Sequence, residues 1–257
     1  MSDPLFPEGA VLVVGGSGGV GRAVCLEFAK AGTDVAITYH RKKENADAVA
    51  AQIKALGRKA TVHQLTIGDQ VRVDAVVDEA AKAHQRLHTV VVGAGTLATQ
   101  VTVAEMTREQ WRTVVEQDLN GFYNVVCATL PKLKAWGGGS YVHLGSAGHL
   151  RWPEGDVMSV APKAAIEALI TGVAREEGRH NIRANTVLLG VIEAGMFLEL
   201  TKQGVFDEKW VREVHKNLAL KRWGKPEEIG HACVFLASNR ALYVTGQRIA
   251  VAGGYGI

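Results

Sequence analysis

The sequence has few cysteines and few prolines, and both are scattered. Its 257 residues include three cysteines and six prolines. Cys25, Cys127 and Cys233 lie far apart in apolar stretches, with no CxxC pair and no metal-ligand spacing. This predicts reduced thiols, no metal site and a cytoplasmic location. No Pro- or Ser-rich linker divides the chain, so we expect a single domain over residues 1–257.

Long runs of one residue class are also missing. The first residues contain no basic region followed by an apolar run, and no uncharged apolar stretch approaches the ~18 residues of a membrane span. We therefore expect no signal peptide and no membrane partner. Acidic and basic residues are interspersed and the net charge is only +3, so nucleic acid is not an expected partner. Hydrophobic residues make up 47% of the chain, which is enough for a sizeable core.

Short β-branched runs alternate with longer amphipathic stretches along the chain. Strands are predicted at Ala10–Val14, Val35–Tyr39, Ala60–Leu65, Thr89–Val92, Tyr141–Leu144, Arg183–Leu188 and Arg248–Val251. Helices are predicted at Val20–Ala31, Lys43–Leu56, Val71–His84, Arg108–Leu133, Val157–Glu177 and Pro226–Ala237. The alternation is typical of βαβ units. It predicts an α/β fold: a Rossmann-like, doubly wound parallel sheet of about seven strands with helices on both faces.

A glycine-rich segment, Gly15-Gly16-Ser17-Gly18-Gly19-Val20-Gly21, joins the first predicted strand to the first helix. Its glycines allow a sharp turn, close approach to a pyrophosphate and tight helix–strand packing. The helix N-terminus offers free N–H groups and a partial positive charge to phosphates. Since a strand, a helix and a second strand frame the motif, we predict a dinucleotide site. Its candidate residues are Gly15, Ser17, Gly18, Gly19, Val20 and Gly21.

The end of the second predicted strand indicates which dinucleotide is preferred. An NAD(H) site has an acidic residue there to hold the ribose 2′-hydroxyl. This chain instead has Tyr39, followed by His40 and Arg41. A guanidinium can pair with a 2′-phosphate, so the sequence favours NADP(H) over NAD(H). The alternative interpretation is that Arg41 and its basic neighbours only solubilise a helix start.

The sequence resembles the short-chain dehydrogenase/reductase family over essentially its whole length. Gly15, Gly19 and Gly21 reproduce the family's GxxxGxG spacing. Four C-terminal segments resemble the bacterial oxoacyl-reductase-like branch: 224–229, 235–238, 245–247 and 253–254. The resemblance implies an oxidoreductase using a nicotinamide dinucleotide, and a homodimer or homotetramer formed through the helices at 108–133 and 157–177. It also implies further cofactor contacts at Thr66, Gly93, Ala94, Lys163, Gly190 and Ile192.

The catalytic positions of the family are partly altered here. The resemblance places Ser146 at the family's serine, Ser159 at its tyrosine and Lys163 at its lysine. The asparagine position falls on Asp118, although Asn120 lies close by, and the sequence leaves open which of the two faces the cofactor. Ser159 and Lys163 are four residues apart and share a helix face. Ser159 is a much weaker acid than a phenol near pKa 10, which puts the usual proton donation in doubt.

Three functions remain open. The first is NADPH-dependent reduction of a conjugated C=C bond in an acyl thioester, because Ser159, Lys163 and Asp118 resemble the dienoyl-CoA reductases of the same family. There, hydroxyl groups stabilise an enolate oxygen, and a water held by Asp118 protonates the carbon. The second is reduction of a C=O bond with a substitute acid drawn from His149, Asp156 or a lysine-bound water. The third is a catalytically silent NADP(H)-binding protein that acts as a sensor or oligomer scaffold.

The segment 195–220 interrupts the alternation and corresponds to the family's substrate-covering loop. Its apolar residues predict a small-molecule substrate with an apolar or acyl-chain part: Met196, Phe197, Leu198, Leu200, Phe206 and Trp210. Part of this apolar stripe could instead serve ordinary packing.

Overall fold

Seven parallel strands form one sheet in the computed structural model, which describes residues 4–97 and 99–257. The strands lie in the order β3-β2-β1-β4-β5-β6-β7. Their bounds are β1 Ala10–Val14, β2 Asp34–Tyr39, β3 Ala60–Gln64, β4 Leu87–Val92, β5 Gly139–Ser146, β6 Ile182–Leu189 and β7 Arg248–Val251. Every residue of β1 and β4 is buried, as expected for central strands covered on both faces. The predicted fold class is confirmed.

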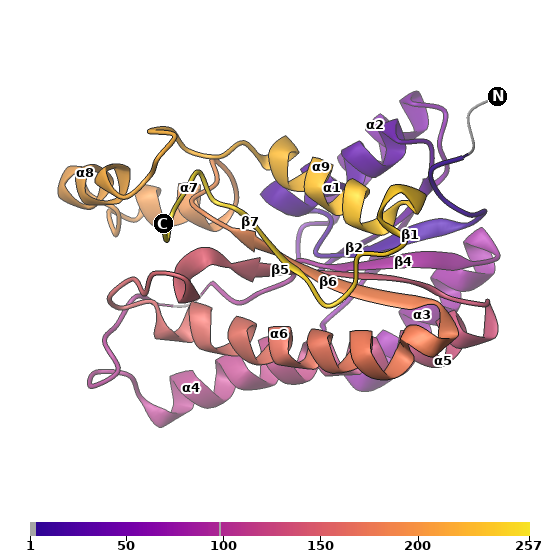
Figure 1. Cartoon of the computed structure of the whole chain (residues 1–257), viewed down its shortest axis with the longest axis horizontal. Coiled ribbons are helices and arrows are strands. Elements are labelled where there is room, and N and C mark those ends of the chain that lie inside the picture. Colours follow the sequence, from indigo (N-terminus) through magenta and orange to yellow (C-terminus); the bar gives the residue numbers. More distant parts are fainter. Residues whose placement is uncertain (1–3, 98) are drawn as a thin grey trace.

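Helices cover the two faces of the sheet in separate layers (Figure 1). One layer contains α1 Gly19–Lys30, α2 Lys43–Ala55 and α9 Pro226–Ala237. The other contains α3 Gln70–His84, α5 Gly121–Ala135 and α6 Val157–Glu177. Each layer encloses its own hydrophobic core, one around Phe28, Ile37 and Ile229, and the other around Phe122, Leu133 and Ile170. Helices with one apolar face therefore sandwich a sheet that is apolar on both faces.

The strand order places a topological switch point beside β1, which pairs with β2 on one side and β4 on the other. The connections leave β1 and β4 in opposite directions along the sheet, so their helices diverge and open a crevice. Because all seven strands are parallel, their carboxyl ends meet at this same edge. Ligands of doubly wound sheets bind in such a crevice.

The predicted helix at 108–133 is instead divided into three parts. α4 covers Arg108–Val114, a π-helical turn covers Val115–Asn120, and α5 follows. A π-helical turn accommodates an extra residue and shifts the helix face that follows it. It buries Asp118 and leaves Asn120 exposed, where the Asn120 amide donates a hydrogen bond to Glu116 Oε2 at 2.6 Å. The structure thus shows that Asp118 faces the interior and Asn120 the solvent, a choice that the sequence left open.

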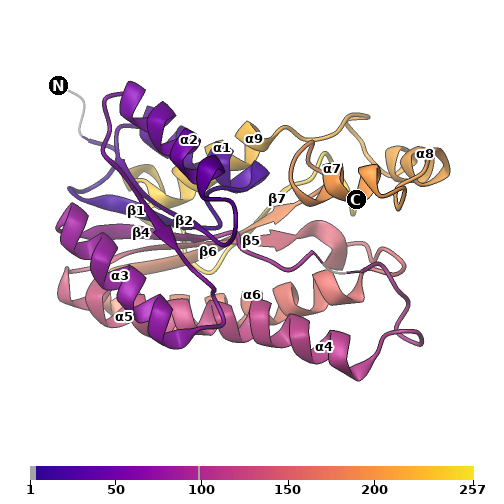
Figure 2. The ribbon, with the colours of Figure 1, turned by 180° about the vertical axis from the view of Figure 1, so that it is seen from behind.

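The segment 192–220 contains two short helices that the sequence pattern did not predict. They are α7 Met196–Lys202 and α8 Glu208–Lys216. α8 begins at Asp207, whose side chain accepts a hydrogen bond from the backbone nitrogen of Trp210 at 2.7 Å. Both helices lie beyond the carboxyl edge of the sheet, away from the two main helix layers (Figure 2). They are therefore placed to cover the crevice rather than the sheet.

Within the described residues, one helical stretch, Val157–His180, is long and apolar enough to cross a membrane by length and composition alone. Most of it is α6, which packs against β5 and β6. It buries the charged side chains of Lys163 and Glu167 at 9% and 3% exposure. Its apolar character is that of a core helix.

Candidate active site

The glycine-rich turn between β1 and α1 is folded so tightly that side chains do not fit at several of its positions, among them Gly15 and Gly21. Gly15 has a φ of +84°, and its backbone nitrogen donates to Thr38 Oγ1 at 3.0 Å. A Cβ added to Gly15 would lie 3.0 Å from the backbone nitrogen of Ala94. A Cβ added to Gly21 would lie 2.1 Å from the carbonyl oxygen of Gly15. The absence of side chains at these glycines therefore lets the backbones of β1, α1 and the segment after β4 pack closely.

The first turn of α1 is open to an anion. Gly18 occupies its N-cap, and no side chain caps the helix there. Gly18 is exposed, and a Cβ there would have its nearest neighbour only at 3.6 Å. Gly19 is also exposed but lies against the segment before α7, since a Cβ there would be 2.5 Å from the backbone nitrogen of Gly195. Uncapped N–H groups at a helix N-terminus suit a phosphate. This cradle fits a dinucleotide, whose pyrophosphate Ser17, Gly18, Gly19 and Val20 would hold.

The other predicted cofactor residues also follow strands at this edge. Arg41 is exposed just after β2, and among the described residues it forms no ion pair. Lys43, two positions later, is held by Asp47 Oδ2 at 2.7 Å. The guanidinium of Arg41 is therefore more available than the ammonium group of Lys43 to pair with an anion at the end of β2. The remaining predicted contacts are His40 after β2, Thr66 after β3, Gly93 and Ala94 after β4, and Gly190 and Ile192 after β6.

A cleft of about 280 Å³ opens at the same edge of the sheet. Eight of the predicted residues line it: Val20, Gly93, Ala94, Ser146, Ser159, Lys163, Gly190 and Ile192. The other predicted cofactor and catalytic residues are not part of its lining: Gly15, Ser17, Gly18, Gly19, Gly21, His40, Arg41, Thr66 and Asp118. The cleft thus brings Ser146, Ser159 and Lys163 together with residues that follow β4 and β6.

Lys163 and Asp118 form a buried ion pair beside the cleft. Lys163 Nζ lies 3.7 Å from Asp118 Oδ2 and donates to the carbonyl oxygen of Ser159 at 3.2 Å. Asp118 Oδ1 accepts from both the backbone nitrogen and the hydroxyl of Thr96, each at 2.8 Å. Asp118 is only 6% exposed and Lys163 only 9%. Two hydrogen bonds from Thr96 fix the Asp118 side chain, and its ion pair with Lys163 positions the lysine.

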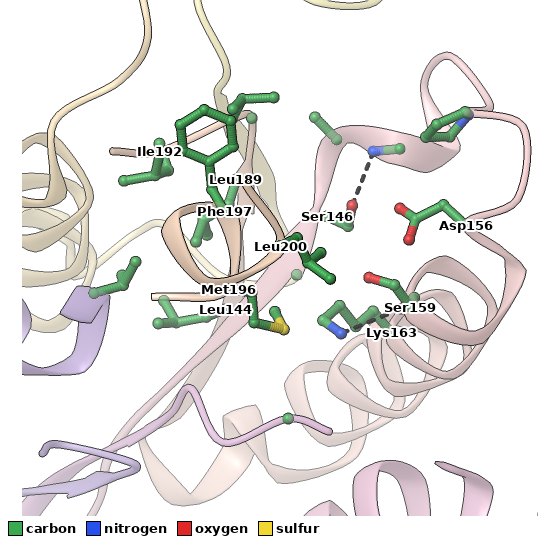
Figure 3. Close-up of a pocket in the computed structure, with 18 of the residues that line it drawn as sticks. Leu144, Ser146, Asp156, Ser159, Lys163, Leu189, Ile192, Met196, Phe197 and Leu200 are labelled. Carbon is green, nitrogen blue, oxygen red and sulfur yellow. Dashed lines mark hydrogen bonds between the residues drawn. The ribbon is translucent and has the colours of Figure 1, made fainter. Parts of the chain in front are cut away.

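Ser146 and Ser159 face the cleft from different elements. Ser146 ends β5, and its Oγ accepts a hydrogen bond from the backbone nitrogen of Gly148 at 3.0 Å. Ser159 lies in the first turn of α6, one turn before Lys163. Figure 3 shows Ser146, Ser159, Lys163 and Asp156 gathered around one part of the cleft. Ser146 Oγ accepts from Gly148, so its own proton is free to be donated to a substrate oxygen.

Three further residues belong to this region without having been predicted. Thr96 holds Asp118, as described above. Gln100 lines the cleft and donates from Nε2 to Asp156 Oδ1 at 2.8 Å, and Tyr255 lines the cleft from the C-terminal segment. Thr96 and Gln100 follow β4, whose position at the carboxyl edge was the signal available for them. Tyr255 had no such signal, because only the tertiary fold brings the chain end back to the cleft.

The histidines of this region are poorly suited to donate a proton. His143 is buried in β5, and burial lowers its pKa to about 3, so its ring is neutral. His149 does not line the cleft, and its Nδ1 lies 3.3 Å from Glu167 Oε1. Burial, and then the charge of Arg248, lower the pKa of His149. Of the side chains considered as substitute acids, Asp156 is the one that lines the cleft.

Glu167 is predicted to make stability depend on pH. Burial raises the pKa of Glu167 to about 7, against the opposing charge of Arg248, whose Nη1 lies 3.9 Å from Glu167 Oε2. A carboxyl whose pKa is raised on folding stabilises the fold while it is protonated, and that contribution is lost as pH rises through its folded pKa. Between roughly pH 5 and 8, the free energy of unfolding should fall by about 2 kcal/mol more than in Glu167→Gln.

Chemical denaturation across this pH range measures that difference. Glu176→Gln, an exposed position on the same helix, is the matched control and should follow the unaltered chain. Parallel pH curves for the unaltered chain and Glu167→Gln would contradict the prediction.

An aromatic cluster forms the outer wall of the cleft. Phe206 and Trp210 stack with ring centroids 3.9 Å apart, and Phe197 lies 5.9 Å from Phe206 and 5.3 Å from Trp223. Phe197, Phe206 and Trp210 all line the cleft, together with Met196 and Leu200. Stacking between rings fixes α7 against α8. One wall of the cleft is therefore apolar, opposite the polar residues of β5 and α6.

Comparison with known proteins agrees with this architecture. The family model described as enoyl-(acyl carrier protein) reductase matches residues 15–256. The 3-oxoacyl-[acyl-carrier-protein] reductase FabG of Staphylococcus aureus is 30% identical over 245 residues, covering 95% of this chain and 97% of the relative. The uncharacterised oxidoreductase YgfF of Escherichia coli is 36% identical over 248 residues, covering 95% and 98%.

A solved structure of a short-chain dehydrogenase/reductase from Mycobacterium ulcerans superposes with a TM-score of 0.91 at 26% identity, covering 98% of this chain and 91% of the other. The chain therefore belongs to the short-chain dehydrogenase/reductase family. It is an oxidoreductase with the Rossmann-like fold of that family.

Proposed function

We propose that the chain is an NADPH-dependent reductase that converts the C=O group of an apolar acyl thioester into an alcohol. The observation that carries this proposal is the cleft itself, in which Lys163 and two serine hydroxyls face an aromatic and aliphatic wall, while Asp118 pairs with Lys163 from behind the lining. The match to 3-oxoacyl-[acyl-carrier-protein] reductases supports an acyl thioester as the substrate class. The apolar wall suits an acyl chain, and the polar side suits a reacting oxygen.

When bound, the reduced nicotinamide supplies a hydride to the substrate carbon. Lys163, held by Asp118 and by the Ser159 carbonyl, would orient the nicotinamide ribose and place a positive charge beside the reacting oxygen. Ser146 and Ser159 would donate hydrogen bonds to that oxygen as negative charge develops on it. α7 and α8 would cover the acyl chain and exclude water from the cleft.

Reduction of a conjugated C=C bond is the second candidate, because a serine replaces the tyrosine that normally gives a proton to a carbonyl oxygen. The same two hydroxyls would then stabilise an enolate oxygen. A panel of 3-oxoacyl and enoyl thioesters, assayed by NADPH consumption, separates the two candidates. Consumption with oxoacyl thioesters alone supports the proposal. NADPH binding without turnover on either series would leave a silent NADP(H)-binding family member that acts as a sensor or oligomer scaffold.

The preference for NADPH is tested at Arg41. Arg41→Ala should raise the Kd of NADPH at least tenfold and change the Kd of NADH less than about twofold, because only NADPH carries the 2′-phosphate that the guanidinium would pair with. Titration followed by NADPH fluorescence measures both constants. Lys43→Ala, whose charge is held by Asp47, serves as the control and should leave both constants unchanged. Tighter binding of NADH than of NADPH by the unaltered chain would overturn the assignment.

Family membership supports a proposal for the assembly and the location of the chain. We propose a cytoplasmic homodimer or homotetramer in which the helices α4, α5 and α6 contact a second copy. Light scattering of the purified chain tests the assembly.

A further inference from the structure

Asp156 occupies an unusual position for an acidic residue at a helix start. It is the N-cap of α6, a position at which aspartate normally accepts a hydrogen bond from a backbone nitrogen of the first turn. Here its side chain makes no such bond. The backbone nitrogens of Ser159 and Val160 bond instead to its carbonyl oxygen, at 3.1 and 2.9 Å. The carboxyl group is therefore free for another role.

The carboxyl group of Asp156 is held in place by the segment that follows β4. Gln100 Nε2 donates to Asp156 Oδ1 at 2.8 Å, and the Val101 backbone nitrogen donates to the Gly155 carbonyl oxygen at 3.0 Å. The segment after β4 is thus tied to the start of α6 and fixes the carboxyl orientation. Figure 3 shows Ser159 and Asp156 at the same part of the cleft, and both line it. A side-chain hydrogen bond with Ser159 is among the influences on the pKa of Asp156.

Burial raises the pKa of Asp156 above its ordinary value, although Gln100, Lys163 and Ser159 each lower it. Lys163 on its own helix is the charged group that acts on it, Asp156 in turn acts on Tyr255 of the C-terminal segment, and Glu154 lines the same cleft. Tyr255 is a phenol whose own pKa is raised, so it remains uncharged near neutral pH. Asp156 therefore keeps its proton to a higher pH than an exposed aspartate.

We propose that Asp156 is the general acid of this enzyme and acts through the hydroxyl of Ser159. This inference rests on the proposed reduction of a C=O group. As the hydride forms the new C–H bond, the C=O π pair takes a proton from Ser159 Oγ. Ser159 Oγ takes a proton from Asp156 in the same step. The products are the alcohol, oxidised cofactor and an Asp156 carboxylate, which regains a proton from water entering the cleft.

This relay explains how a serine can stand in a position that needs a proton donor. An aliphatic hydroxyl alone is too weak an acid, whereas a hydroxyl backed by a carboxylic acid passes a proton without becoming an alkoxide. Asp118 is not placed to serve in this way, because it does not line the cleft and its carboxyl oxygens contact Thr96 and Lys163.

The test is the pH dependence of turnover in Asp156→Asn, which keeps the shape of the side chain and removes its proton. In the unaltered chain kcat/KM should fall as pH rises through the pKa of Asp156. In Asp156→Asn kcat should be at least about 100-fold lower, and kcat/KM should no longer fall with rising pH in this range. The Kd of NADPH should stay unchanged. Asp156→Glu should recover part of the rate. Asp69→Asn, at the N-cap of α3, is the matched control and should keep full turnover.

Each result bears on a separate claim. If Asp156→Asn reduces oxoacyl thioesters as fast as the unaltered chain and with the same pH profile, the relay is wrong and the proposed function stands. A large loss in Tyr255→Phe without a loss in Asp156→Asn would overturn the relay in favour of the phenol. If the unaltered chain reduces no oxoacyl thioester, the proposed function fails, and with it the step assigned to Asp156.

Discussion

Lys163→Met is expected to abolish reduction and to destabilise the fold at the same time. The substitution leaves Asp118 as a buried charge whose remaining hydrogen bonds come from Thr96 alone. Breaking a buried ion pair by removing one partner costs about 3 kcal/mol in the free energy of unfolding. It also removes the positive charge beside the reacting oxygen, so turnover should fall at least about 1,000-fold.

A second substitution separates the two effects. In the double variant Lys163→Met with Asp118→Asn, no buried charge is left without its partner, so most of the lost stability should return. Turnover should stay lost, because the lysine is still missing. Denaturation curves and NADPH consumption measure the two quantities independently. If turnover returns together with stability, Lys163 acts only in folding.

Gly21→Ala is expected to have the largest effect on the dinucleotide site. Its new Cβ would lie 2.1 Å from the carbonyl oxygen of Gly15, so either α1 or the turn must move. We expect a loss of about 3 kcal/mol in the free energy of unfolding, typical of severe overpacking. NADPH binding should also be lost, because the displaced backbone is the phosphate cradle.

Gly172→Ala is the matched control for this prediction. Gly172 lies within α6, and a Cβ there would have no neighbour within 4 Å. Because alanine favours the helix over glycine, this variant should be about 0.5–1 kcal/mol more stable and should bind NADPH normally. Normal NADPH binding by Gly21→Ala would mean that the turn is not the phosphate cradle.

Most of the sheet and most of the helices could be predicted from local pattern. β1 and β7 have the predicted bounds, and the other strands differ from theirs by one or two residues at an end, because β-branched runs bounded by glycine or polar residues carry strong signals. The π-helical turn Val115–Asn120 could not be predicted, since no residue type specifies it. α7 and α8 were not predicted. Their aromatic residues pack against one another and against Trp223, and not against the sheet.

The sequence by itself determined the fold class and the glycine turn, because each depends on residue type and local spacing. The placement of Ser159 at the family's tyrosine position stays a prediction from the resemblance. Only the tertiary structure decided that Asp118 rather than Asn120 pairs with Lys163, since a local change in helix winding sets that choice. It also decided that Gln100, Asp156 and Tyr255 share one cleft, because three separate chain segments must meet there. Contacts between residues far apart in the chain leave no periodic signal in the sequence, and the chemistry proposed for this cleft depends on such contacts.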